Sequence, residues 1–296
     1  MVCLTDKIDL ITDCQLFVRK EYLNHKYISG NKWRKLKYNL VEARNQKKTT
    51  LLTFGGAYSN HIAAVAAAGK EYGFQTVGVI RGEELENRKQ LNSTLNFARN
   101  CGMRFKFITR EAYKLKSSPS YLKELQNEFD DFYLLPEGGT NDLAIKGCQE
   151  MISEEDKIYD YICCPVGTGG TISGVINASW THQKILGFPA LKGDFLKEEI
   201  SKFATKSNWE LISDYHFGGY AKVNAELIEF INRFKTENKI PLDPVYTGKM
   251  IFGIYQLIEK GYFPNQAKIL VIHTGGLQGI DGMNSVLKNK NLPLIQ

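Results

Sequence analysis

The sequence lacks long apolar runs and paired cysteines. No stretch of the 296 residues approaches the roughly 18–20 consecutive apolar residues of a membrane helix, and the N-terminal residues do not form a secretion signal. The six cysteines include no C-x-x-C pair and show no metal-ligand spacing. We therefore expect a cytoplasmic protein with reduced thiols, no metal site and no membrane association.

Signatures of nucleotide and nucleic-acid binding are also missing. The glycine-rich segment 165–174 is neither a Walker A loop nor a G-x-G-x-x-G followed by a ribose-binding acid. The net charge is only +6, and the densest basic stretch, Lys32–Lys48, carries apolar residues at helical spacing. This pattern is typical of a solvated helix face, so we expect no nucleic-acid partner.

What remains is an ordinary globular composition, with 43% hydrophobic and 24% charged residues. At this length a single core gives way to two lobes, and a cleft between lobes is a common place for small-molecule chemistry. No internal repeat, low-complexity tract or long linker separates parts of the chain. Two closely joined lobes are therefore expected.

Short β-branched or apolar runs alternate with longer helical patterns along the chain. The expected strands lie at residues 16–19, 49–54, 75–80 and 104–109, and helical patterns lie between them at 59–73 and 92–102. The same rhythm returns after Asn141 and continues to residues 268–276. This βαβα order predicts an α/β protein with two doubly wound lobes and largely parallel sheets.

The segment Pro165–Gly174 follows an expected strand and opens a helical pattern. Its glycines, Gly167, Gly169 and Gly170, would let the backbone approach an anion. The free amides of residues 168–171 and the positive end of the helix would point toward that anion, so a phosphate would fit there. A glycine-rich tight turn without a ligand is the alternative.

A lysine and a capping segment complete the pattern. Lys32 stands near the expected start of a helix, where the helix dipole and burial would both favour the neutral amine that Schiff-base chemistry requires. The alternative is an ordinary surface lysine. In Thr53–His61, a strand leads through glycines into a helix that begins near Ser59, and capping alone would explain a serine or asparagine there.

Together these segments resemble the 1-aminocyclopropane-1-carboxylate (ACC) deaminase and D-cysteine desulfhydrase family of pyridoxal-phosphate (PLP) enzymes. The family's G-N-K-x-R-K-L signature stands at residues 30–36, its G-G-x-x-S-N motif at 55–60, and its phosphate cup at 167–171. The resemblance extends from Leu16 to about Met283. It implies the tryptophan-synthase-β-like fold (fold type II) with PLP in the interlobe cleft. Residues 1–35 with 144–296 would form the large PLP-binding domain, and 36–143 the small domain.

The resemblance also assigns roles to residues. The cofactor-binding residues would be Lys32, Asn60, Gly167, Thr168, Gly169, Gly170, Thr171 and Thr274. The catalytic residues would be Lys32, Ser59, Tyr220 and Tyr246, and the substrate would contact Tyr58, Ser59, Asn60, His61 and Thr247. Lys32 would bind PLP covalently and Asn60 would bind its 3-oxygen. For the two tyrosines, core packing is the alternative.

Three positions favour the desulfhydrase branch over the deaminase branch. Thr247 stands where ACC deaminases have glutamate, Thr274 where they have leucine, and His61 where they tend to have glutamine. A neutral hydroxyl near the pyridine nitrogen would make PLP a weaker electron sink than a carboxylate would. Such a sink suffices when a good β-leaving group departs.

The expected reaction is therefore PLP-dependent β-elimination from an amino acid, most simply D-cysteine to pyruvate, ammonia and hydrogen sulfide. The alternatives are ACC deamination, a PLP lyase or deaminase acting on another amino acid, and a PLP- or phosphate-binding protein without turnover. The family implies a small amino-acid substrate and a homodimer. Three departures stand out: Tyr22 where an acid is usual, Tyr58 where many relatives have glutamine, and no tryptophan in the segment 81–84.

Overall fold

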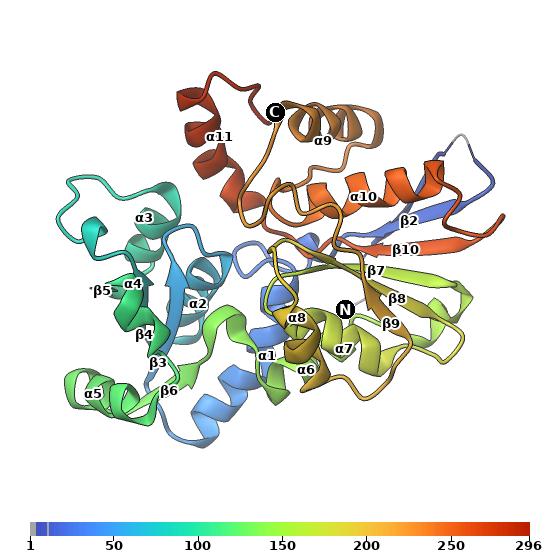
Figure 1. Ribbon diagram of the computed structural model, residues 1–296. Helices are drawn as coiled ribbons and strands as arrows, with labels where there is room; N and C mark the ends of the chain where they lie inside the picture. The colour runs from blue at the N-terminus through green and yellow to red at the C-terminus, as the bar shows by residue number, and fades with distance from the viewer. Residues whose placement is uncertain (1–3, 11) are drawn as a thin grey trace.

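Two sheets organise the chain in the computed structural model, which describes residues 4–10 and 12–296 (Figure 1). The larger sheet consists of β1 (Thr5–Ile8), β2 (Gln15–Arg19), β10 (Lys268–Ile272), β7 (Tyr161–Val166), β8 (Lys184–Pro189) and β9 (Trp209–Leu211), in that spatial order. The smaller sheet consists of β5 (Arg104–Ile108), β4 (Gln75–Arg81), β3 (Thr50–Gly56) and β6 (Phe132–Leu135). All neighbouring strands are parallel except β1 and β2. The predicted doubly wound α/β fold is confirmed.

The helices fill the intervals between the strands. They are α1 (Asn31–Asn45), α2 (Asn60–Tyr72), α3 (Ser93–Asn100), α4 (Arg110–Lys114), α5 (Pro119–Phe129), α6 (Asp142–Gln149), α7 (Gly170–Ala178), α8 (Phe195–Ser201), α9 (Ala225–Asn238), α10 (Thr247–Glu259) and α11 (Ile280–Asn289). Polar side chains begin several of them: Ser59 caps α2, Asn92 caps α3 and Asn141 caps α6, each by accepting a backbone N–H bond.

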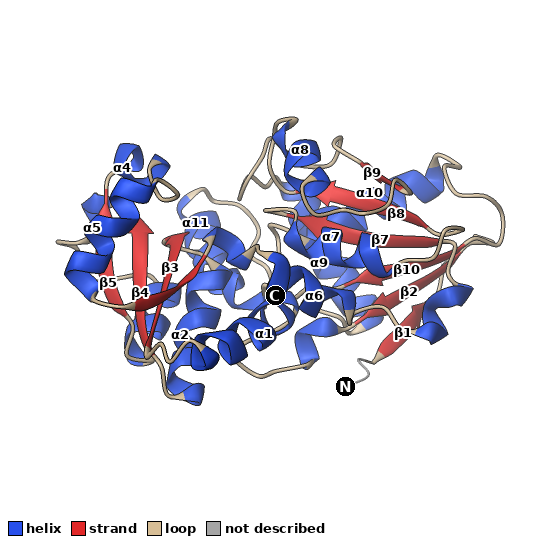
Figure 2. Ribbon diagram, turned by 90° about the horizontal axis from the view of Figure 1, so that it is seen from below, coloured by secondary structure: helices blue, strands red, loops and turns tan. Residues whose placement is uncertain are grey.

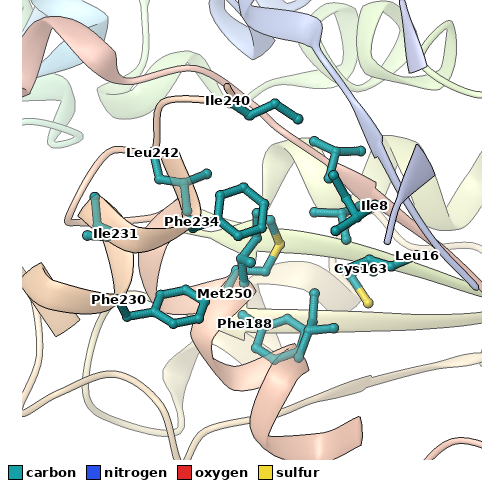
Figure 3. Close-up of a cluster of buried hydrophobic side chains, with 14 of the residues drawn as sticks. Ile8, Leu16, Cys163, Phe188, Phe230, Ile231, Phe234, Ile240, Leu242 and Met250 are labelled. Atoms are coloured by element: carbon teal, nitrogen blue, oxygen red, sulfur yellow. The ribbon is translucent and has the colours of Figure 1, made fainter. Parts of the chain in front are cut away.

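Each sheet buries both of its faces, as parallel sheets do. On one face of the larger sheet, strand residues such as Leu16 and Phe188 pack against Phe234 of α9 and Met250 of α10 (Figure 3). On the other face, the alternate residues of β7 pack against α7 and α8. The smaller sheet lies between α1, α2 and α3 on one side and α4 and α5 on the other.

Helices α1 and α6 lie between the two sheets (Figure 2). They approach closely because α6 has a glycine at the crossing: a Cβ on Gly147 would lie 1.9 Å from the carbonyl oxygen of Arg34. The domain boundaries expected at 35/36 and 143/144 fall inside these two helices. Those boundaries remain predictions, but each expected domain contains one complete sheet.

Two further observations concern membrane-spanning helices and disulfides. No helix within the described residues is long and apolar enough to cross a membrane. The five described cysteines, Cys14, Cys101, Cys148, Cys163 and Cys164, form no disulfide, and Cys3 lies outside the described residues.

Candidate active site

The carboxyl ends of β3, β4 and β7 open into one cavity of about 290 Å³, which the starts of α1, α2 and α7 also line. Thirteen of the fourteen site residues expected from the sequence line it: Lys32, Tyr58, Ser59, Asn60, His61, Gly167, Thr168, Gly169, Gly170, Thr171, Tyr220, Tyr246 and Thr274. The amine of Lys32 and the glycine-rich segment 167–171, which we call the glycine cup, are far apart in sequence but line the same cavity. This is the geometry on which the PLP assignment depends.

The glycine cup has the form of an anion site. Gly169 precedes α7 with φ +84°, and no side chain caps the first amides of that helix. A Cβ on Gly170 would lie 2.7 Å from Thr140 Oγ1 and 3.1 Å from Lys35 Nζ, so only glycine leaves this space open. Uncapped amides at a helix N-terminus beside a buried ammonium group fit a phosphate.

Lys35 is a residue that the sequence analysis missed. Its side chain is buried, and Nζ donates to the carbonyl oxygen of Gly138 at 2.8 Å and to Thr140 Oγ1 at 3.2 Å. Because Lys35 follows Lys32 by three residues on α1, both amines lie on the same face of the helix. That spacing was the available signal. Burial lowers the pKa of the Lys35 amine. A phosphate beside it would favour the ammonium form, so Lys35 would supply positive charge for the cofactor phosphate.

Lys32 is held at the cavity by the turn that precedes it. Gly30 has φ +66°, and a Cβ there would lie 1.9 Å from the carbonyl oxygen of Thr274, which also accepts the Asn31 N–H at 3.1 Å. Only glycine permits this approach. Burial, aided by the positive charge of Lys35, lowers the pKa of the Lys32 amine to about 7. A large fraction of the amine is therefore neutral at physiological pH.

Two side chains at the start of α2 have unused hydrogen-bonding capacity. Within the described residues, Asn60 Oδ1 and both ring nitrogens of His61 are buried without a partner. Burial, followed by the charges of Lys32 and Lys35, lowers the pKa of His61 well below its usual value, so the imidazole is neutral. Unpaired buried polar atoms are costly, and a polar ligand in the cavity would satisfy them. They fit a polar ligand group beside Asn60 and His61 that can donate a hydrogen bond to Asn60 Oδ1.

Ser59 caps α2, which the sequence analysis gave as the alternative to a role in ligand binding. Its Oγ accepts the backbone N–H of Ile62 at 3.3 Å. The hydroxyl hydrogen stays available, and the residue lines the cavity. Capping and ligand binding are therefore compatible at this position.

The two unusual tyrosines have different surroundings. Tyr58 lies half-exposed at the cavity, and a Cβ on Gly282 of α11 would lie 2.8 Å from its ring. Tyr22 is outside the cavity lining, and its ring centroid lies 4.4 Å from that of His273. The position of the lost acid is thus occupied by an aromatic contact, whereas Tyr58 can meet a substrate directly.

Tyr220 and Tyr246 form a pair on the cavity wall, with ring centroids 6.2 Å apart in an edge-on arrangement. Burial raises the pKa of both phenols, that of Tyr246 well above its usual value. Both groups are therefore protonated at neutral pH and can donate a hydrogen bond or a proton. The position of Tyr246 is set by Gly167, where a Cβ would lie 3.2 Å from the ring.

Thr247 is the one expected site residue that does not line the cavity. The expectation that it contacts the substrate is therefore corrected. Its side chain is fully buried outside the cavity lining. Thr247 Oγ1 donates to Asp243 Oδ1 at 2.7 Å and accepts the Asp243 N–H at 3.0 Å. Asp243 also accepts the backbone N–H groups of Val245, Tyr246 and Thr247. Thr247 thus belongs to the turn that begins α10, and of the two branch-marking threonines only Thr274 lines the cavity.

Comparisons with known proteins agree with this geometry. A family model described as "Pyridoxal-phosphate dependent enzyme" matches residues 6–275. The chain is 31% identical to the bifunctional D-cysteine desulfhydrase/1-aminocyclopropane-1-carboxylate deaminase of Arabidopsis thaliana, over 93% of this chain and 76% of that protein. It is 29% identical to a putative 1-aminocyclopropane-1-carboxylate deaminase of Pyrococcus furiosus, over 92% and 88% of the two chains.

Two solved structures have a similar fold. The crystal structure of an ACC deaminase homologue superposes with a TM-score of 0.80 at 27% identity, covering 93% of this chain and 89% of that one. An O-acetylserine-dependent cystathionine β-synthase from Helicobacter pylori superposes with a TM-score of 0.67 at 15% identity, covering 94% of each chain. The second similarity concerns the fold alone.

Proposed function

Because the chain belongs to the pyridoxal-phosphate-dependent enzymes, and among them to the ACC deaminase family, we propose that it catalyses β-elimination from D-cysteine. Hydrogen sulfide leaves, and hydrolysis of the remaining product with one water gives pyruvate and ammonia. The choice of β-elimination rests on one observation. Glu137 is the only carboxylate on the described cavity wall, and it already accepts from Tyr113 Oη at 2.7 Å and lies 3.4 Å from Lys116 Nζ.

A site without a free carboxylate lacks the usual means of stabilising a protonated pyridine ring. The neighbouring Asp243 does not change this, because its oxygens accept four hydrogen bonds from the turn that begins α10. The cofactor would then be a modest electron sink, which suits a substrate with a good β-leaving group such as thiolate. Thr274 on the wall supports the same choice.

Residues of the chain would bind the cofactor and the substrate and would transfer the protons. PLP, when bound, stabilises negative charge at the substrate Cα. Lys32 would hold the cofactor and remove the Cα proton through its neutral amine. Ser59 and the first amides of α2 would bind the substrate carboxylate. The protonated phenols of Tyr220 and Tyr246 would donate a proton to the departing sulfur.

A substrate panel tests the proposal. The purified holoenzyme is given D-cysteine, L-cysteine, D-serine and ACC, and sulfide, pyruvate and 2-oxobutyrate are measured. We expect sulfide and pyruvate in equal amounts from D-cysteine. The second candidate is ACC deamination, which the names of the relatives support equally; 2-oxobutyrate from ACC without sulfide from D-cysteine would replace our proposal with it. Turnover of another amino acid alone would indicate a different lyase or deaminase.

The pH dependence of cofactor attachment should report the lowered pKa of Lys32. Only the neutral amine reacts, so the rate at which the cofactor-free protein recovers its visible absorbance with PLP should fall about tenfold per pH unit below pH 7. Above about pH 8 the rate should level off. A rate that keeps rising toward the ordinary lysine pKa of 10.5 would contradict the desolvated amine.

Two properties stay predictions from the family resemblance and the sequence. We propose a homodimer, which light scattering of the purified protein would detect as twice the chain mass of 33.6 kDa. The cytoplasmic location likewise rests on the sequence alone.

A further inference from the structure

Arg81 is a charged group on the cavity wall that the proposed reaction does not use. It is the last residue of β4, so it stands at the carboxyl end of a strand, where parallel sheets bind ligands. Its guanidinium carbon lies 5.4 Å from the centroid of the Tyr113 ring, and a Cβ on Gly56 would lie 3.6 Å from Nη2. The ring supports the guanidinium group, and the glycine leaves space beside it.

Arg81 is exposed to solvent, and the Tyr113 ring is the one protein partner of its guanidinium group among the described residues. Among the described residues, no acceptor lies within hydrogen-bond or ion-pair distance of its nitrogens. Glu137, the carboxylate on the same wall, has its own partners in Tyr113 and Lys116. Lys35 belongs to the phosphate cup, and Lys32 carries the cofactor. Arg81 is thus the remaining cation of the described cavity wall.

The proposed reaction places the substrate's α-carboxylate at the start of α2. An additional free arginine points to an additional negative charge, because a guanidinium group presents paired donors that match a planar anion. We infer that Arg81 binds a negatively charged group on the substrate side chain. The site then prefers amino acids with an anionic side chain to neutral ones of the same shape.

This inference rests on the proposed function in that the ligand is an amino acid whose α-carboxylate lies at the start of α2 and in that Lys32 and Lys35 hold the cofactor. The probes are aspartate and asparagine, which have nearly the same shape and differ by one charge. Both enantiomers are titrated into the holoenzyme by calorimetry. We expect the wild type to bind aspartate at least about tenfold more tightly than asparagine, since a charge-assisted pair is added. Arg81→Gln should remove that preference and leave asparagine binding unchanged.

Arg104 provides a matched control. It is also an exposed arginine over an aromatic ring, with its guanidinium carbon 5.5 Å from the Phe129 centroid. It begins β5, the parallel neighbour of β4, and therefore lies at the opposite edge of the sheet from the cavity. Arg104→Gln should keep the preference for aspartate. Arg81→Lys should keep part of it, which separates lost charge from misfolding.

Other results of these titrations would contradict the inference. Equal affinities of the wild type for the two probes, or no binding of aspartate, would overturn the inference. An equal loss of both affinities in Arg81→Gln would also overturn it, because Arg81 would then bind the α-carboxylate. These measurements require no turnover. A failure to release sulfide from D-cysteine would therefore reject the proposed reaction and leave the role of Arg81 standing.

Discussion

Replacing Lys32 with alanine should abolish the visible absorbance band of the lysine-bound cofactor and lower turnover by at least about 10³-fold. The amine is the one group at the start of α1 that combines access to the cavity with a pKa of about 7. Without it the cofactor would have no covalent attachment, and the substrate Cα would have no base. The absorbance of the purified variant and its rate with D-cysteine measure the two losses separately.

Lys37→Ala is the matched control for this experiment. Lys37 lies on the same helix, but it is exposed and pairs with Glu150 Oε2 at 2.7 Å outside the cavity. The control should keep both the absorbance band and the rate. If the band persisted in Lys32→Ala, another amine would carry the cofactor, and Lys35 would be the first to examine because it lines the same cavity.

Replacing Glu21 with alanine should lower the free energy of unfolding by about 3 kcal/mol, because it removes a buried acceptor of Arg34 and Asn24 while Arg34 keeps its contact with Glu150. Glu21 is fully buried. Its oxygens accept from Arg34 Nε at 2.9 Å, Arg34 Nη2 at 3.1 Å and Asn24 Nδ2 at 3.1 Å. Arg34 follows Lys32 by two residues, so this pair fixes the first turn of α1. Urea unfolding monitored by circular dichroism measures the loss.

A surface pair provides the comparison. Glu154 and Lys157 form an exposed ion pair three residues apart, and Glu154→Ala should change stability by less than about 1 kcal/mol. Glu21→Gln should lose less than Glu21→Ala, because the amide still accepts hydrogen bonds. A loss in Glu21→Ala no larger than that of the surface variant would show that the buried pair does not hold α1 in place.

Much of the fold and site was accessible from the sequence because its signals are local. A strand period followed by a helix period predicted the order of elements, and glycines at residues 55–56 and 167–170 marked strand ends. The carboxyl ends of parallel strands meet at one edge, so motifs at such ends gather at one site. Lys32, Asn60 and Gly169 therefore line one cavity, as the resemblance required.

Other features were decided by contacts between distant segments. The antiparallel pairing of β1, the burial of Lys35 against Thr140, and the bonds between Thr247 and Asp243 have no local signature strong enough to predict them. Thr247 shows the reason: a motif gives the residue but not the direction of its side chain, which depends on the partner nearest to it.

By itself, the sequence determined the α/β rhythm, the family, and most of the residues that line the cavity. Only the tertiary structure decided which charges remain unpaired there. A charge's effect depends on the burial and partners that folding provides, and Arg81 and Glu137, which line the same cavity, differ in this way. Glu137 has its own partners, whereas the guanidinium group of Arg81 has no hydrogen-bond or ion-pair partner among the described residues.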